Sequence, residues 1–436
     1  MAARTASPTD VHEPDFGNVF VAAYPPFGCW TAAEVAGLAP HLERPPPPVP
    51  LGLYVHIPFC VERCQYCYYL AYDDRPEARG GYPSALAAEL ELYLPQPLLA
   101  GRPLDFVYFG GGTPSSLNVQ GIERLLGLLQ ERLPWSTTRE VTFECAPRTL
   151  TESKARALKA GGVTRISLGV QALDDEVLAH SGRVHKVADV RRAWEILRRV
   201  GFPLVNVDLI VGLPGESEAG FLRGLEGVIA LAPDNVTLYQ LEIPANTPLH
   251  RRLTGGLPPA PTPSWAEKHA RLTRGFELLG AAGYGLRSAY TAYRASEHRP
   301  FLYQDEQYAG ADVLGLGVSA FSYLDGMHFQ NVSRLEPYLL SLAREVAPVA
   351  RARLLSPEER LVRRLVLQLK LLRVPLEPLR AEFGARALAP FATTLERLAA
   401  SGWLEFDDEA LTLTPAGVPR VDRILPELYL AAHRGA

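Results

Sequence analysis

Between residues 51 and 240, short apolar runs alternate with longer stretches in which apolar residues recur every three or four positions. Short apolar runs are typical of buried strands, and the longer periodic stretches are typical of amphipathic helices. The pattern predicts strands at 51–57, 104–109, 140–143, 164–168, 204–210 and 235–240. It predicts helices between them, at 82–94, 121–133, 151–160, 187–200 and 217–230.

Regular alternation of strand and helix indicates right-handed βαβ units and a parallel sheet. Six strands are fewer than the eight that close a complete barrel of this type. We therefore predict an α/β fold, an incomplete (β/α)6 barrel, over residues 51–256.

The sequence on either side of this barrel departs from the alternation. Residues 1–50 form an irregular N-terminal extension that ends in four consecutive prolines, a stiff linker. A proline-rich break opens a connecting segment at 257–355, which contains a glycine-rich stretch at 314–321. Residues 356–436 are predicted to be a helical, winged-helix-like C-terminal domain.

The winged-helix prediction rests on a helix at 388–401 followed by short strands at 404–406 and 411–414. Many modules of this shape bind DNA, but the predicted wing has few basic residues. We expect a packing or lid module instead, because a fold by itself does not establish a function.

Composition narrows the function classes. The 436 residues are 47% hydrophobic and 21% charged, values that are ordinary for a soluble globular chain. The net charge of −4 argues against nucleic-acid binding through bulk positive charge. No apolar run reaches membrane-spanning length, and the first residues lack the apolar core of a signal peptide. We expect a cytoplasmic protein without a membrane span.

Three of the five cysteines, Cys60, Cys64 and Cys67, fall within eight residues directly after the first predicted strand. Loops at this end of the strands carry the active site in α/β barrels. A zinc site would need a fourth ligand, for which His56 on the strand is the nearby candidate. Three thiolates with no nearby fourth favour a [4Fe–4S] cluster that leaves one iron open. The isolated Cys29 and Cys145 are predicted to be small buried side chains rather than ligands.

An open iron can bind a small ligand through an amine and a carboxylate, a pair that S-adenosylmethionine (SAM) carries. The segment from Tyr54 to Cys67 resembles the cluster loop of radical SAM enzymes, including the aromatic Tyr66 before the third cysteine. More narrowly, it resembles the family of the oxygen-independent coproporphyrinogen III oxidase. The resemblance runs from about Tyr24, in a Tyr-Pro-Pro-Phe segment, to the C-terminus.

The resemblance implies a SAM site built from the ends of successive strands. Its expected positions are Gly110, Gly111, Gly112 and Thr113 beside the methionine part, Glu144, Gln171, Arg183 at the carboxylate, Asp208 at the ribose, and Tyr54 and Tyr66 nearby. Phe321, in the second glycine-rich stretch, matches a position that lines a second SAM molecule. We expect Glu144, Gln171, Arg183 and Asp208 to face one cleft beside the cluster.

The family mechanism implies reductive cleavage of SAM to a 5′-deoxyadenosyl radical, with an electron donor such as flavodoxin or ferredoxin. The namesake reaction is oxidative decarboxylation of tetrapyrrole propionates in porphyrin and haem biosynthesis, and a tetrapyrrole is our first expectation for the substrate. One departure is that Tyr68-Tyr69-Leu70 stands where the authentic oxidase carries Gly-Cys-Asn. Relatives also suggest a two-SAM methyltransferase or cyclopropanase of natural-product biosynthesis, or a haem chaperone.

Charge near the cluster separates these alternatives. Propionates removed from water need cationic or hydrogen-bonding partners. The candidates in the sequence are Arg63, Arg287 and Arg294, and a tetrapyrrole substrate predicts that at least one of them lines the cleft. An apolar cleft walled by Tyr68, Tyr69 and Phe321 would favour a neutral substrate instead.

Overall fold

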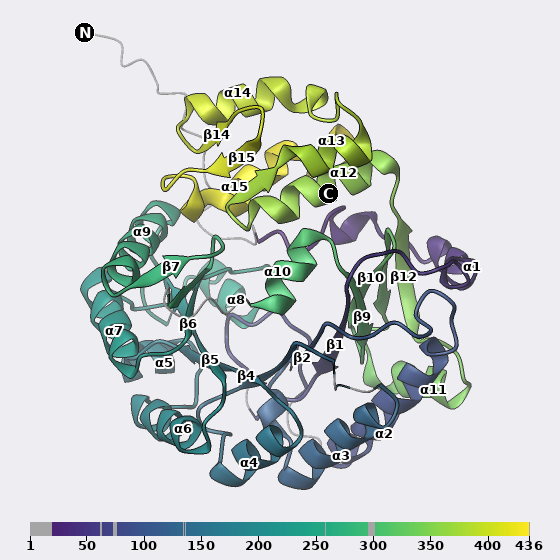
Figure 1. The fold of residues 1–436 in the computed structure, drawn as a ribbon. Coiled ribbons are helices and arrows are strands. Elements are labelled where there is room, and N and C mark those ends of the chain that lie inside the picture. Colours follow the sequence, from purple (N-terminus) through teal and green to yellow (C-terminus); the bar gives the residue numbers. More distant parts are fainter. Residues whose placement is uncertain are drawn as a thin grey trace.

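The computed structural model describes residues 20–435 except for 62, 73–75, 134, 136, 258 and 295–300 (Figure 1). The first 19 residues of the predicted N-terminal extension lie outside the described residues.

A single large sheet forms the centre of the fold. Its strands are β1 (Leu51–Ile57), β2 (Phe106–Gly111), β3 (Glu140–Cys145), β4 (Arg165–Gln171), β5 (Leu204–Val211), β6 (Asn235–Gln240), β7 (Tyr284–Leu286), β8 (Thr291–Arg294), β9 (Asp312–Leu316), β10 (Phe321–Leu324), β11 (Met327–Asn331) and β12 (Val349–Leu354). The strand order is β12-β11-β10-β9-β1-β2-β3-β4-β5-β6-β8-β7. Strands β1 to β6 pair in parallel and in sequence order, so the predicted six-stranded partial barrel is confirmed.

Helices cover the outer face of this curved sheet (Figure 1). They are α1 (Leu38–Leu42), α2 (Pro76–Tyr93), α3 (Val119–Gln130), α4 (Glu152–Ala160), α5 (Asp175–His180), α6 (Val187–Val200), α7 (Glu218–Leu231), α9 (Trp265–Ala281) and α11 (Leu335–Ala343). Helices α8 (Pro248–Thr254) and α10 (Leu302–Ala309) lie inside the ring instead (Figure 1). Helix α6 shows why they form: Val190, Ala193, Trp194 and Leu197 are buried on one face, and Gly201 ends the helix in a left-handed conformation.

The strands are almost continuously buried, as expected for a parallel sheet covered on both faces. Four of them continue past their predicted ends. Strand β2 continues to Gly111, β3 to Cys145, β4 to Gln171 and β5 to Val211. Residues that we predicted at loop positions are therefore held by strand pairing.

The segment at 257–355 adds strands to the barrel sheet. Strand β9, within the second glycine-rich stretch, pairs in parallel with β1 on the side opposite β2. Antiparallel strands β10, β11 and β12 extend the sheet from there, and β8 and β7 extend it beyond β6. The predicted connecting segment thus forms both ends of the barrel wall.

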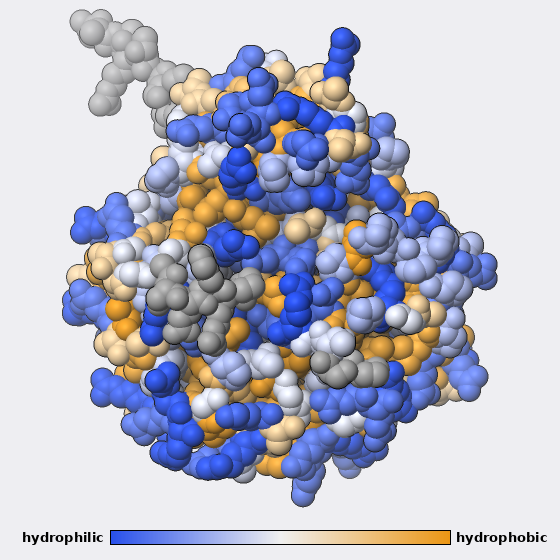
Figure 2. Space-filling view, in the orientation of Figure 1, coloured by the Kyte–Doolittle hydropathy of each residue, from blue (hydrophilic) through white to orange (hydrophobic). Residues whose placement is uncertain are grey.

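The C-terminal module contains α12 (Pro357–Leu369), α13 (Leu376–Phe383), α14 (Ala392–Ala400) and α15 (Val421–Ile424), with strands β13 (Arg373–Pro375), β14 (Leu404–Phe406) and β15 (Ala410–Leu413). Its three strands form a separate antiparallel sheet in the order β13-β15-β14, which agrees with the winged-helix-like prediction. The module packs on one side of the barrel, and Figure 2 shows apolar surface where the two meet. Their shared core includes Tyr290 and Tyr308 of the barrel and Val21 and Tyr24 of the N-terminal segment.

Among the described helices, none has both the length and the apolar composition that a membrane span requires.

Candidate active site

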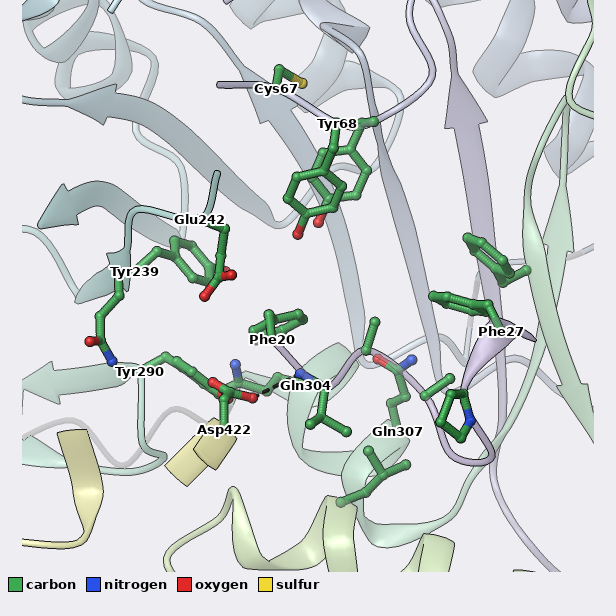
Figure 3. Close-up of a pocket in the computed structure, with 18 of the residues that line it drawn as sticks. Phe20, Phe27, Cys67, Tyr68, Tyr239, Glu242, Tyr290, Gln304, Gln307 and Asp422 are labelled. Carbon is green, nitrogen blue, oxygen red and sulfur yellow. Dashed lines mark hydrogen bonds between the residues drawn. The ribbon is translucent and has the colours of Figure 1, made fainter. Parts of the chain in front are cut away.

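A cavity of about 2550 Å³ lies at the carboxyl ends of the barrel strands and extends to the C-terminal module. The three clustered cysteines line it together with Glu144, Gln171, Arg183 and Asp208, so the predicted side chains face one cavity. In Figure 3, Cys67 and Tyr68 lie on one side and Gln304, Gln307 and Asp422 on the opposite side. The other predicted residues at this wall are Tyr54, Tyr66, Gly111, Gly112, Thr113 and Phe321.

The cysteine loop follows β1 and is held by its own backbone. The Cys60 amide donates to the Tyr72 carbonyl at 3.0 Å, and the Cys67 amide donates to the Cys64 carbonyl at 3.2 Å. Two side chains donate to the sulfurs. The Thr113 hydroxyl lies 3.4 Å from Cys60 Sγ, and Arg183 Nη1 lies 3.2 Å from Cys64 Sγ. Such donors favour the thiolate form of a cysteine.

Burial acts in the opposite direction on the thiols. It raises the pKa of Cys60, and it raises the pKa of Cys67 to about 11. Metal binding must therefore displace protons from this loop. Within the part of the chain that the structure describes, no three His, Cys, Asp or Glu side chains are arranged to hold a single metal ion.

His56, the candidate fourth ligand of a zinc site, has both ring nitrogens engaged. Nε2 lies 3.1 Å from the Leu70 carbonyl, and because a carbonyl only accepts, Nε2 must be the donor. Nδ1 then accepts from the Tyr54 hydroxyl at 3.2 Å. Burial lowers the pKa of His56 to about 4, so the ring is neutral. Through these two hydrogen bonds, His56 connects the end of the cysteine loop to β1. Neither ring nitrogen is then available to bind zinc.

The glycines at the end of β2 have a packing role that the sequence did not reveal. Gly111 has φ +110°, and a Cβ there would lie 2.6 Å from the His56 ring. A Cβ on Gly112 would lie 2.9 Å from the Phe59 carbonyl oxygen. The Gly112 amide donates to the Ile57 carbonyl at 2.8 Å. These glycines let the β2 loop lie directly against the cysteine loop. Gly110 does not line the cavity, because it packs on Tyr108 and Glu144.

Two partly buried carboxyl groups lie at the ends of β3 and β5. Glu144 Oε1 accepts from the Tyr108 hydroxyl at 2.6 Å, and burial raises the pKa of Glu144 to about 7. Asp208 accepts from the Ser167 hydroxyl and from Asn206 Nδ2, each at 2.7 Å. Burial also raises the pKa of Asp208. The carboxyl oxygens of Glu144 and Asp208 are therefore oriented by hydrogen bonds within the protein, independently of a bound ligand.

Gln171 and Arg183 meet at the end of β4. Gln171 has a positive φ of 69°, at a register shift between β4 and β5. Arg183 Nη2 donates to the Gly169 carbonyl at 2.6 Å, while its Nη1 contacts Cys64. Its buried Nε has no hydrogen-bond partner among the described residues.

Of the three predicted cationic candidates, only Arg63 lines the cavity, where its Nη2 donates to the Cys67 carbonyl at 3.2 Å. Arg287 instead pairs with Asp305 at 3.0 Å, and Arg294 donates to the Ala232 carbonyl. Neither of those two is among the residues that line the cavity. The expectation that at least one of the three arginines lines the cleft is met by Arg63, while carboxylate or carbonyl partners hold Arg287 and Arg294 elsewhere.

Sequence reasoning missed two parts of the wall. The N-terminal segment from Phe20 to Trp30 lines the cavity, and the Val21 amide donates to Asp422 at 2.9 Å. Its Tyr-Pro-Pro-Phe stretch was the available signal. Arg351 and Arg363 also line the cavity. These two arginines lie on β12 and α12, outside the predicted barrel. No motif in the sequence identifies them as residues of the cavity.

Comparisons with known proteins agree with this geometry. Residues 54–225 match the model of the radical SAM superfamily, and residues 355–420 match the HemN C-terminal domain. The chain is 30% identical over 414 residues to the oxygen-independent coproporphyrinogen III oxidase of Pseudomonas aeruginosa, covering 87% of each chain. It is also 30% identical over 402 residues to the heme chaperone HemW of Mycobacterium tuberculosis, covering 91% of this chain and 97% of the relative.

A solved structure is similar along almost the whole chain. The coproporphyrinogen III oxidase (HemN) from Escherichia coli aligns with a TM-score of 0.82 and 26% identity. The alignment covers 94% of this chain and 96% of the other.

Proposed function

Because this chain belongs to the radical SAM superfamily, in the family that contains oxygen-independent coproporphyrinogen III oxidases and HemW heme chaperones, we propose that it is a radical SAM enzyme acting on a carboxylate-bearing tetrapyrrole. The cofactors of the superfamily are a [4Fe–4S] cluster and S-adenosylmethionine. When bound, they supply one-electron cleavage of a carbon–sulfur bond and a 5′-deoxyadenosyl radical that removes hydrogen from an unactivated carbon.

The cysteine loop fits the cluster. Cys60, Cys64 and Cys67 would each hold a different iron, so their sulfurs need not converge on one point as single-ion ligands do. The Thr113 and Arg183 contacts to two of the sulfurs support this assignment, because both donors stabilise thiolates. Cys29 and Cys145 lie outside the loop, and burial raises the pKa of Cys145 to about 12. Cys145 ends β3 and Cys29 belongs to the N-terminal segment, so neither is part of the loop that would hold the cluster.

The ends of β3, β4 and β5 fit SAM. Glu144 and Asp208 offer oriented carboxyl oxygens, Gln171 offers an amide, and Arg183 offers a guanidinium suited to a carboxylate. On one side of this site the rings of Tyr108 and Tyr303 stack, with their centres 4.1 Å apart. These side chains would bind and orient the molecule and exclude water from the reacting atoms.

The observation that carries the substrate assignment is one cavity that joins the cysteine loop to cationic side chains. Ligand pockets for small molecules are commonly about 300–1,000 Å³. The cavity here, about 2550 Å³, has room for SAM and a large planar substrate together. Arg63 stands beside the cysteines and Arg351 lines a wall made by β12, so cationic partners for carboxylates are available at two places in the cavity. The 5′-deoxyadenosyl radical would remove one hydrogen atom from a propionate, and loss of carbon dioxide would then form the vinyl group and pass one electron to an external one-electron acceptor. This is the reaction that the arrangement supports best.

A second candidate is a haem chaperone, which binds its tetrapyrrole without converting it. The similarity over 91% of this chain to a protein named heme chaperone HemW favours it. The sequence Tyr68-Tyr69-Leu70 also departs from the authentic oxidase, and the rings of Tyr68 and Tyr69 stack at 4.8 Å beside the cysteine loop.

One experiment separates these activities. The protein is reconstituted anaerobically with iron, sulfide, SAM and a one-electron donor such as flavodoxin, then incubated with coproporphyrinogen III or with haem. Mass analysis follows the tetrapyrrole and the nucleoside product together.

Vinyl-bearing products formed with 5′-deoxyadenosine would establish decarboxylation. Stoichiometric haem binding with no converted tetrapyrrole would instead establish the chaperone function. Cleavage of SAM with neither outcome would overturn the tetrapyrrole assignment and favour methyl transfer or cyclopropane formation on another substrate.

A further inference from the structure

Arg351 of β12 is a rigidly held cation in the cavity wall. Its Nε donates to Gln330 Oε1 at 2.7 Å, and its Nη1 donates to the Phe27 carbonyl at 2.9 Å. The guanidinium carbon also lies 5.7 Å from the Phe27 ring and 5.8 Å from the Trp30 ring. These contacts fix the plane of the guanidinium through Nε and Nη1, so its remaining nitrogen, Nη2, can donate to a ligand.

The charge of Arg351 is uncompensated. Among the residues that the structure describes, no carboxylate lies within ion-pair distance of it, whereas Arg353, two positions along the same strand, pairs with Glu34 at 3.1 Å and with Glu359 at 2.6 Å. Burial lowers the pKa of Arg351, while Glu359 and Glu34 raise the pKa of Arg353. A partly buried cation without an acid partner is costly unless a ligand supplies the negative charge.

A second cation strengthens the positive potential at this wall. Arg363 of α12 is 3% exposed and also lines the cavity. Its guanidinium carbon lies 3.3 Å from the centre of the Tyr323 ring, and the described residues include no ion-pair partner for it. Tyr323 in turn contacts His328, which stacks on Trp30 at 4.7 Å.

An exposed aromatic surface adjoins the two arginines. Phe321 is 37% exposed in the cavity, and its ring stacks on Phe27 at 4.5 Å with an interplanar angle of 24°. Phe27 itself faces the cavity in Figure 3. A ligand that joins a planar apolar body to a carboxylate would place the body on Phe321 and the carboxylate at Arg351.

We propose that Arg351 binds a carboxylate of the substrate at the wall formed by β10, β11, β12 and the N-terminal segment. This inference rests on the proposed function and assigns the site that orients the substrate's acidic side chains. The positioned carboxylate anchors the substrate at a wall away from the cysteine loop, so that another side chain of the same molecule reaches the reacting atoms. Because SAM also carries a carboxylate, the test must separate the two ligands.

The test compares Arg351→Met with wild type, each reconstituted with its cluster. Anaerobic equilibrium titration measures the affinity for coproporphyrinogen III without SAM, and a separate titration measures the affinity for SAM without substrate. Loss of a charge-assisted hydrogen bond is expected to weaken coproporphyrinogen binding about tenfold or more. The affinity for SAM should stay within about twofold. Arg287→Met, which removes an arginine outside the cavity, is the control and should bind coproporphyrinogen as wild type does.

A second variant tests the same inference in case Arg351→Met does not fold. Gln330→Glu keeps an acceptor for Arg351 Nε and provides an internal carboxylate, although it loses the Nε2 donation to Ser319. It should also weaken coproporphyrinogen binding while the iron content persists. Unchanged coproporphyrinogen affinity in a folded Arg351→Met protein overturns the inference, and so does a loss confined to SAM. If wild type binds no tetrapyrrole, the proposed function fails first and this inference falls with it.

Discussion

Arg183 Nη1 donates to Cys64 Sγ at 3.2 Å, a contact between residues 119 positions apart in the chain. The same guanidinium donates from Nη2 to the Gly169 carbonyl at 2.6 Å, at the end of β4. One side chain therefore joins the proposed cluster ligand to the strand ends proposed for SAM. Removing the Arg183 side chain should therefore disturb both the proposed cluster site and the proposed SAM site.

Replacing Arg183 by Ala should weaken SAM binding by about 2 kcal/mol, because a buried carboxylate loses a charge-assisted partner. Calorimetric titration of the reconstituted protein measures this. Arg156→Ala, which removes an exposed arginine paired with Glu152 on α4, is the control and should bind SAM normally. Equal affinity in Arg183→Ala and wild type would show that Arg183 has no role in holding SAM.

Alanine at Cys60, Cys64 or Cys67 should abolish the brown absorption of the cluster and SAM cleavage, since three thiolates are the fewest that hold the cluster with one iron open. Iron and sulfide analysis per chain measures the loss. Cys29→Ser and Cys145→Ser should retain wild-type iron. The ligand assignment is wrong if the triple alanine protein keeps full iron content.

The difference in SAM affinity between wild type and Glu144→Gln should depend on pH. Burial raises the pKa of Glu144 to about 7, so in the free folded protein the carboxylate forms as pH rises through that value. A carboxylate that accepts hydrogen bonds from SAM makes wild type gain affinity over the variant from about pH 6 to pH 8. Comparing the two proteins cancels the titration of the ligand's own amino group. A constant difference across this range would exclude ionised Glu144 from the site.

Gly112→Ala should lower the iron content and the melting temperature. The added Cβ would lie 2.9 Å from the Phe59 carbonyl oxygen and 3.0 Å from the Ile57 carbonyl oxygen, so the β2 loop must move away from the backbone that leads to Cys60. Gly127→Ala on α3 is the matched control, because a Cβ added there would meet no described atom within 4 Å outside its own helix backbone. Alanine there should stabilise the helix by up to about 1 kcal/mol. Equal iron content in both variants would contradict the packing role of Gly112.

Glu89 of α2 should make stability depend on pH. Its Oε2 accepts from the Gly317 amide at 2.7 Å and from the Tyr338 hydroxyl at 2.6 Å, and burial raises its pKa from 4.5 to about 7. A carboxyl group whose pKa is higher in the folded than in the unfolded protein stabilises the folded state at pH values below the unfolded pKa. That contribution is lost as the pH rises to about 7. Relative to Glu89→Gln, wild type should lose about 3 kcal/mol between pH 4.5 and pH 8.

Thermal unfolding over this pH range checks the Glu89 prediction. Glu91→Gln provides the control, since Glu91 lies on the same helix but is exposed and paired with Arg132 at 2.5 Å. The Glu91→Gln profile serves as the reference for a surface carboxylate of α2. Parallel profiles for wild type and Glu89→Gln would refute the effect.

Local patterns in the sequence determined the alternating strands and helices, the cysteine loop and the strand ends that face the cavity. A strand buried on both faces must be apolar throughout, and parallel strands present their carboxyl ends at one edge, so these features are visible within short windows. The cysteine spacing is equally local, because Cys60, Cys64 and Cys67 belong to one loop.

Only the tertiary structure decided which charged groups meet. Arg63 lines the cavity, as its place between Cys60 and Cys64 suggests, whereas Arg287 is held by Asp305, a partner 18 positions away that its own neighbours do not reveal. Arg351 faces the cavity because β12 is placed three strands beyond β9, and Arg183 reaches Cys64 across 119 positions. The periodicity of apolar residues indicates which face of a helix or strand is buried. The direction of a side chain toward a cavity and its charge partner depend on how distant elements pack, which no short window of sequence contains.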